Sequence, residues 1–185
     1  MYRFAPASEH EPTVFGSARP GYSNKQVNEW IEFMQTQNIQ RVCCLLSESE
    51  LGSYSNLLDV YQQTFGTSQI CWSPIKDFRF AKPQTLMHQI LPFLALAERC
   101  QDKVVVHCAG GIGRTGHVLA AWLVAGRSFS HKAAIAAVQK TGRNPYESVM
   151  AAPFQGRNPW KVAAELNTLL DECRRFKDQR SNLES

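Results

Sequence analysis

The fold of this chain is decided by the stretch Val104-Val105-Val106-His107-Cys108-Ala109-Gly110-Gly111-Ile112-Gly113-Arg114-Thr115-Gly116. The valines predict a buried strand, and the residues from Arg114 onward predict a helix. Three of the five residues between Cys108 and Arg114 are glycines, so the backbone can curl until its N–H groups converge on one point. The stretch therefore predicts a strand, a tight loop and a helix that together bind an anion the size of phosphate.

The same loop favours a reactive thiolate at Cys108. Converging N–H dipoles, the positive end of the following helix and the Arg114 guanidinium all stabilise the thiolate over the thiol. The planar fork of Arg114 can hold two phosphoryl oxygens and stay on them as charge spreads in the transition state. Thr115 can donate its hydroxyl to the sulfur and stabilise the thiolate as a leaving group. We therefore expect a cysteine nucleophile with two supporting residues.

These residues resemble the signature of the cysteine-dependent protein tyrosine phosphatase superfamily. A bare Cys-x5-Arg also occurs in sulfurtransferase-like and arsenate-reducing folds, but His107, the glycines and the Thr115-Gly116 tail narrow the resemblance to phosphatases. It implies metal-independent hydrolysis through a phosphocysteine, without a cofactor. The phosphate would be bound by the loop residues Ala109, Gly110, Gly111, Ile112, Gly113 and Arg114. His107 either orients the loop by hydrogen bonding or is an ordinary histidine at a strand end.

The mechanism needs a general acid opposite the cysteine, because an alkoxide or phenoxide leaves phosphorus poorly without a proton. Asp77 follows an apolar strand at residues 70–75, and the carboxyl ends of parallel strands meet at one edge of a sheet. The other aspartates considered fall in helical patterns or at the opposite edge. They are Asp59, Asp102, Asp171 and Asp178. The segment 72–83 also resembles the mobile acid loop of the family, so we predict that Asp77 is the acid.

Two further residues are candidates for supporting roles. Arg79 flanks the acid loop and would attract an anionic substrate, or it is a plain surface charge. Gln155 is similar to the glutamine with which the family positions water, although the spacing of residues 143–155 departs from the usual one.

The length and composition of the chain indicate its domain organisation and general class of protein. With 185 residues, 44% of them apolar, the chain predicts one phosphatase domain over residues 1–185, with a core at about 13–176 and a frayed tail at 178–185. No apolar run is long enough to cross a bilayer, and the start lacks a secretion signal, so we expect no membrane insertion and a cytoplasmic location. The net charge of +4 comes from scattered residues, which argues against nucleic-acid binding.

The six cysteines show no metal-ligand spacing. We therefore expect no metal, and we expect five of the six in the core. The sixth, Cys108, would be prone to oxidation as a thiolate, and reversible pairing with a nearby strand cysteine is a minor alternative.

The hydrophobic periodicity predicts an α/β fold in which helices flank a mainly parallel central sheet. Ser23 and Gln26 form a capping box for the first helix, whose buried face holds Val27, Trp30, Ile31 and Met34. Pro92 should kink or divide one helix. The predicted strands are 39–46, 69–74 and 103–107, and the predicted helices are 56–64, 83–100, 114–125, 130–140 and 159 to about 176.

The short chain resembles the compact dual-specificity group of the superfamily, whose shallow pocket implies phosphotyrosine, phosphoserine and phosphothreonine proteins as substrates and partners. The loop holds no lysine, which disfavours inositol lipids with several phosphates. Hydrolysis of phosphoinositides or of RNA 5′-triphosphates stays open as an alternative. A binding module without activity is also open, but Cys108, Arg114 and Asp77 are all present and argue against it.

Overall fold

A computed structural model of the protein describes residues 2–183, with side chains for residues 2–175. Its centre is a five-stranded sheet in the order β1-β2-β5-β3-β4. β1 pairs antiparallel with β2, and the remaining pairs are parallel, so the predicted α/β fold with a mainly parallel sheet is confirmed. The strands are β1 (Ala5–Pro6), β2 (Val14–Ala18), β3 (Ile39–Cys44), β4 (Ile70–Trp72) and β5 (Lys103–Cys108).

β5 lies in the middle of the sheet and is buried on both faces, which explains its run of valines. Side chains of successive strand residues point to opposite faces. Val104 and Val106 therefore pack into one hydrophobic cluster and Val105 into another. The two clusters are the two halves of the core, one on each face of the sheet.

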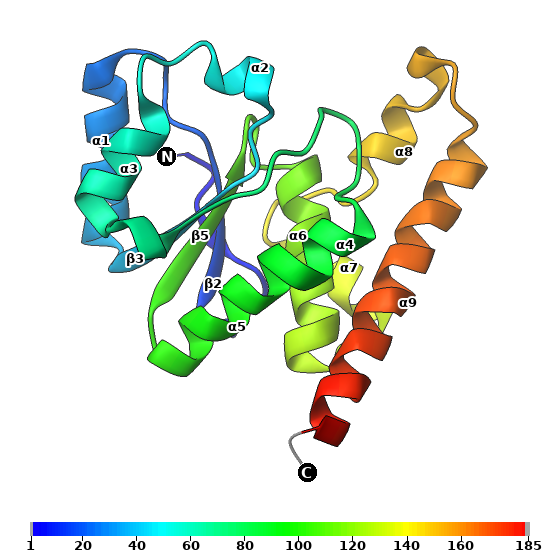
Figure 1. Ribbon diagram of the computed structural model, residues 1–185. Helices are drawn as coiled ribbons and strands as arrows, with labels where there is room; N and C mark the ends of the chain where they lie inside the picture. Colours follow the sequence, from blue (N-terminus) through cyan, green and yellow to red (C-terminus); the bar gives the residue numbers. More distant parts are fainter. Residues whose placement is uncertain (1, 184–185) are drawn as a thin grey trace.

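Helices cover both faces (Figure 1). On one face lie α1 (Asn24–Thr36) and α3 (Leu57–Phe65), and on the other lie α5 (Leu91–Cys100), α6 (Gly113–Arg127), α7 (His131–Lys140) and α9 (Pro159–Leu183). The predicted capping box is present at the start of α1, where Ser23 and Gln26 bond reciprocally, and the predicted face is buried. No helix within residues 2–183 combines the length and the apolar character needed to span a bilayer.

Pro92 divides the helical segment that precedes β5. Instead of one helix over 83–100, the chain forms α4 (Pro83–Thr85), a π-helical turn at Leu86–Ile90 and then α5. Proline lacks an N–H and its ring crowds the preceding turn, so the regular hydrogen-bond ladder cannot pass through it. The predicted division of this helix is confirmed.

Several elements differ from the sequence prediction. β2 pairs with β5 over five residues, although the sequence suggested only an irregular or short-strand opening. Short elements that were not predicted are α2 (Glu48–Leu51), α8 (Glu147–Ala151) and the 3-10 turns at Thr67–Gln69 and Pro153–Gln155. α9 continues to Leu183, beyond the predicted end near 176, so the backbone of residues 178–183 is helical. Residues 184 and 185 lie outside the described residues.

The cysteines other than Cys108 are not all in the core. Cys43, Cys44 and Cys173 are buried and Cys71 is partly buried, but Cys100 is exposed. The prediction was wrong for Cys100 because this residue ends α5 away from the buried face of that helix, which is formed by Leu91, Leu94 and Ala97.

Candidate active site

The loop between β5 and α6 forms a cradle at the carboxyl edge of the sheet. Cys108 ends the strand and is 2% exposed. Gly111 has a φ of +69°, and a Cβ there would lie 2.5 Å from the backbone of Ser17 at the end of β2. Gly110 has open space instead, with nothing nearer than 4.0 Å. The loop therefore requires glycine at 111, where it turns tightly against β2, and tolerates a side chain at 110.

Two contacts fix the sulfur and the loop that carries it. The Thr115 hydroxyl donates to Cys108 Sγ at 3.2 Å, as expected for that residue from the sequence. The backbone N–H of Arg19 donates to the carbonyls of Cys108 and Ala109, at 3.0 and 3.3 Å. These carbonyls therefore bond to the chain after β2, away from the cradle.

Arg114 is 3% exposed at the start of α6 and is held by Glu50 of α2. Its Nη1 and Nη2 donate to the two Glu50 oxygens at 2.6 and 2.7 Å, a bidentate pair. Burial opposes the charge on Glu50, but hydrogen bonds from Arg114 and Ser47 lower the pKa of Glu50 to about 2. In the same way, Glu50 raises the pKa of Arg114 against the effect of its burial. The guanidinium is thus charged and pre-oriented before any ligand binds.

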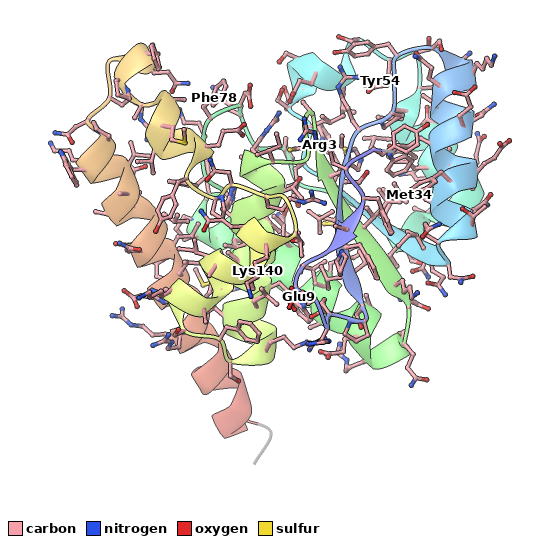
Figure 2. All side chains as sticks on the ribbon, turned by 180° about the vertical axis from the view of Figure 1, so that it is seen from behind. Arg3, Glu9, Met34, Tyr54, Phe78 and Lys140 are labelled. Atoms are coloured by element: carbon pink, nitrogen blue, oxygen red, sulfur yellow. The ribbon has the colours of Figure 1, made fainter. Side chains whose placement is uncertain are left out.

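The structure brings Asp77 to this guanidinium. Its Oδ1 lies 3.3 Å from Arg114 Nη2, while its side chain stays 56% exposed. Asp77 sits on the connection between β4 and α4, which we call the acid loop (residues 73–82). Arg114 Nη1 also donates to the Ile75 carbonyl at 3.0 Å. Figure 2 shows Phe78, the residue after Asp77, at the same end of the molecule as Tyr54 and away from Glu9 and Lys140.

The His107 ring is buried in the core directly before Cys108. Its Nε2 lies 3.3 Å from the Tyr61 hydroxyl, and its ring packs edge-on against Trp30 and Tyr61 in the core under α1 and α3. Burial lowers its pKa to about 3, so the ring is neutral at physiological pH. These contacts anchor the end of β5, and the ring also interacts with the backbone of Cys108.

The two residues given supporting roles lie apart from the cradle. Arg79 lines a groove of about 690 Å³ between the acid loop and α9, together with Arg157 and Lys161. Gln155 is exposed on the 3-10 turn before α9. Among the described residues, no hydrogen bond or ion pair joins the side chain of Gln155 to the phosphate-sized cradle.

A third carboxylate, which was not predicted from the sequence, lies beside Gly113. A Cβ on Gly113 would meet Glu147 Oε2 at 2.0 Å, so the Glu147 carboxylate occupies the space beside that glycine. Burial raises the pKa of Glu147, the Gly113 backbone lowers it, and the charge of nearby Asp77 raises it further. Glu147 therefore belongs to the same group of charges as Asp77 and Arg114.

The sequence partly indicates the positions of Glu50 and Glu147, the two carboxylates that were not predicted as site residues. Ser47-x-x-Glu50 is a capping box directly after the strand at 39–44, and this places Glu50 at the same sheet edge as Cys108. Glu147 follows Asn144-Pro145, a turn pair, but nothing local indicates that this turn returns to Gly113. That placement depends on how α7 and α8 pack.

The sequence is similar to that of a known protein family. A sequence profile described as the catalytic domain of dual specificity phosphatases matches residues 22–150, which include Cys108, Arg114 and Asp77. The chain belongs to this family. A search of the curated proteins finds no match.

Solved structures of phosphatases share the fold. Tk-PTP in its active form is 26% identical with a TM-score of 0.64, over 87% of this chain and 96% of that one. Kinase associated phosphatase with serine in place of its catalytic cysteine is 26% identical with a TM-score of 0.61, over 71% and 78%. PTPMT1 is 17% identical with a TM-score of 0.69, over 97% and 99%, which shows the fold alone. Together with the family profile, these matches indicate a cysteine-based phosphatase.

Proposed function

We propose that this protein hydrolyses phosphomonoesters of phosphotyrosine and of phosphoserine or phosphothreonine in proteins, through a phosphocysteine at Cys108. The observation that carries the proposal is one cluster at the carboxyl edge of the sheet. A thiol bonded by Thr115 lies in a loop that ends in an oriented arginine, and an exposed carboxylate lies 3.3 Å from that arginine. Nucleophile, oxyanion clamp and acid are the three groups that cysteine-based phosphoryl transfer needs.

In the first step, the Cys108 thiolate attacks phosphorus while the bond from phosphorus to the ester oxygen breaks. Asp77 gives its proton to that oxygen, so the substrate leaves as an alcohol or phenol. Arg114 and the loop N–H groups hold the phosphoryl oxygens throughout. Glu50 is unsuitable as the acid because the pKa of its carboxyl lies at about 2 and both its oxygens are bound to Arg114.

In the second step, a water oxygen attacks the phosphocysteine and the bond from phosphorus to sulfur breaks. The Asp77 carboxylate takes the proton from the water, and the Thr115 hydroxyl stabilises the departing thiolate. Glu147 stands beside the loop at Gly113. We assign to Glu147 the water-orienting task that the sequence resemblance had suggested for Gln155.

Protein substrates fit the loop better than inositol lipids with several phosphates. The loop positions between Cys108 and Arg114 carry no cation, so no additional phosphate is neutralised there. PTPMT1 in complex with PI(5)P is among the similar solved structures, but at 15% identity that likeness extends to the fold only. Phosphoprotein hydrolysis is therefore our conclusion for the substrate class.

The test is hydrolysis by the purified protein in the presence of a metal chelator. We expect activity on phosphotyrosine and phosphothreonine peptides and on p-nitrophenyl phosphate, and we expect Cys108→Ser to reduce it by on the order of 10⁴-fold or more. The serine variant should still bind inorganic phosphate, because the N–H groups and Arg114 remain. Undiminished turnover in the serine variant would exclude the phosphocysteine. Inositol lipids hydrolysed faster than every peptide would exclude the protein substrate.

A further inference from the structure

His117 in α6 is a buried, titratable side chain to which the mechanism above gives no task. It is fully buried, one turn after Arg114. Its Nε2 accepts a hydrogen bond from the backbone N–H of Ala81 at 3.0 Å, and its Nδ1 lies 3.3 Å from the carbonyl of Gly113. Ala81 belongs to the acid loop. Gly113 belongs to the loop that joins β5 to α6 (residues 108–114), which we call the phosphate-binding loop in line with the proposed function. One imidazole therefore bridges the two loops.

The two partners determine the protonation of this ring. A carbonyl can only accept, so Nδ1 carries the hydrogen toward Gly113. A backbone N–H can only donate, so Nε2 is bare toward Ala81. Burial lowers the pKa of His117 to about 4, which agrees with a neutral ring. The bridge is thus formed by a single tautomer with a donor on one side and an acceptor on the other.

A ring contact strengthens the attachment of the acid loop. The Phe80 ring packs edge-on against His117, with centroids 5.3 Å apart and planes at 80°. Ala81 itself is 4% exposed, so solvent offers its N–H little opportunity for a substitute partner. Phe80 and Ala81 of the acid loop therefore both contact the side chain of His117 in α6.

At its start, the acid loop is attached by backbone hydrogen bonds from Ser73 and Ile75 to the carbonyls of Cys44 and Leu45, at 3.0 and 3.2 Å. Two further attachments lie near Asp77. Arg114 donates to the Ile75 carbonyl but must also hold Glu50 and the substrate. Arg157 donates to the Phe78 carbonyl at 3.4 Å and is also paired with Glu165. His117 is the attachment that ties the end of the acid loop to the helix on which Arg114 stands.

We propose that His117 is a positioning residue for Asp77: by bridging Gly113 and Ala81 it holds the acid loop in register with the phosphate-binding loop. This inference rests on the proposed function, since it assigns His117 to the protonation step. Without the acceptor, the buried Ala81 N–H loses its partner and the end of the loop shifts to find another. The shift displaces the acid, and a misplacement of ~1 Å in a catalytic group costs about 10²-fold in rate.

The role predicts a dependence on the leaving group. Phenyl phosphate needs the proton from Asp77 far more than p-nitrophenyl phosphate, whose phenolate leaves unaided. We expect His117→Leu to lower kcat/KM for phenyl phosphate by about 10- to 100-fold, and that for p-nitrophenyl phosphate by less than about threefold. His117→Gln places an amide oxygen where Nε2 accepts from Ala81, so it should recover most of the phenyl phosphate activity. His117→Asn is the matched polar control, since its side chain is too short to reach Ala81.

A double-mutant cycle tests whether His117 acts through Asp77. In an Asp77→Asn background, His117→Leu should cause no further loss on phenyl phosphate. A full additional loss there, or an equal loss on both substrates in the single variant, would overturn the positioning role. If the leucine variant does not fold, Gln against Asn gives the same comparison, and equal activities of these two would also overturn it.

Failure of the proposed function gives a different result. A wild-type protein that hydrolyses neither aryl phosphate, or a Cys108→Ser variant that keeps turnover, would remove the phosphocysteine mechanism and this inference with it. A wild type that loses activity on Cys108→Ser, but whose His117 variants show no selectivity for the leaving group, overturns the role of His117 alone.

Discussion

The phosphate-binding loop and the acid loop meet at Arg114 but are built in opposite ways. Cys108 and Arg114 are almost completely buried, and the residues that shape their loop are consecutive. Asp77 is 56% exposed, and its loop is held by side chains from α6 and from the segment before α9. The first loop is a run of consecutive buried residues whose arginine is held by Glu50, whereas the second leaves its acidic side chain exposed to solvent.

This difference matches the tasks that we propose for the two loops. The thiolate and the guanidinium must already be arranged when phosphate arrives, because a preformed cradle costs no reorganisation during the reaction. The acid must reach the ester oxygen and then let the product leave, so an exposed loop with a few attachments suits it. Variants in each loop should therefore fail in distinguishable ways.

Among the variants that distinguish the two loops, the largest effect is expected for a change in the acid loop. Asp77→Asn removes the proton but leaves the cradle intact, so we expect kcat/KM for phenyl phosphate to fall by about 10²- to 10⁴-fold and that for p-nitrophenyl phosphate to fall far less. Steady-state kinetics with both esters measures this. Equal losses on the two esters would indicate that Asp77 is not the acid, and Glu147 would then be examined as its replacement.

A pair of glycine variants tests the phosphate-binding loop. Gly111 has positive φ and its Cβ would clash with the backbone near Ser17, so Gly111→Ala should lower the free energy of unfolding by about 1–3 kcal/mol and weaken phosphate binding. Gly110→Ala is the matched control, because a Cβ there meets open space. Urea unfolding and phosphate titration of both variants measure the effects. Similar losses in the two would contradict the loop geometry.

Glu147→Gln tests the second step of the proposed reaction, the hydrolysis of the phosphocysteine. If Glu147 orients the attacking water, hydrolysis of the phosphocysteine slows while its formation does not. We expect kcat for p-nitrophenyl phosphate to fall by about tenfold, and a burst of one nitrophenol per enzyme to appear before the steady state. A slower steady rate without any burst would place the defect in the first step instead.

The smallest expected effect concerns the Glu50–Arg114 pair. The pKa of Glu50 is about 2 in the folded protein and about 4.3 when unfolded, so its contribution to stability is complete above about pH 4.3 and is lost as the pH falls toward 2. Glu50→Gln does not titrate. The difference in unfolding free energy between wild type and Glu50→Gln should therefore shrink between about pH 4.3 and pH 2. A difference that stays constant over this range would contradict the assigned pairing.

The sequence by itself determined the loop after β5 and the layers of the fold. A run of valines, three glycines and the start of a helix are local signals, because strand burial, turn formation and helix initiation each depend on neighbouring residues. The capping box of α1 and the interruption before Pro92 followed from the same kind of signal. The carboxyl ends of parallel strands meet at one edge of a sheet, and this extended the reasoning to Asp77. The structure places Asp77 beside Arg114.

Only the tertiary structure decided which other side chains reach the cradle. Glu50, Glu147 and His117 come from three separate elements, and their contacts with Arg114, Gly113 and Ala81 exist because those elements pack around one sheet edge. Gln155 had a suitable residue type, yet its turn leaves it exposed. Local chemistry specifies what a residue can do, but chain packing fixes its distance from the reacting atoms, and no local pattern encodes that distance.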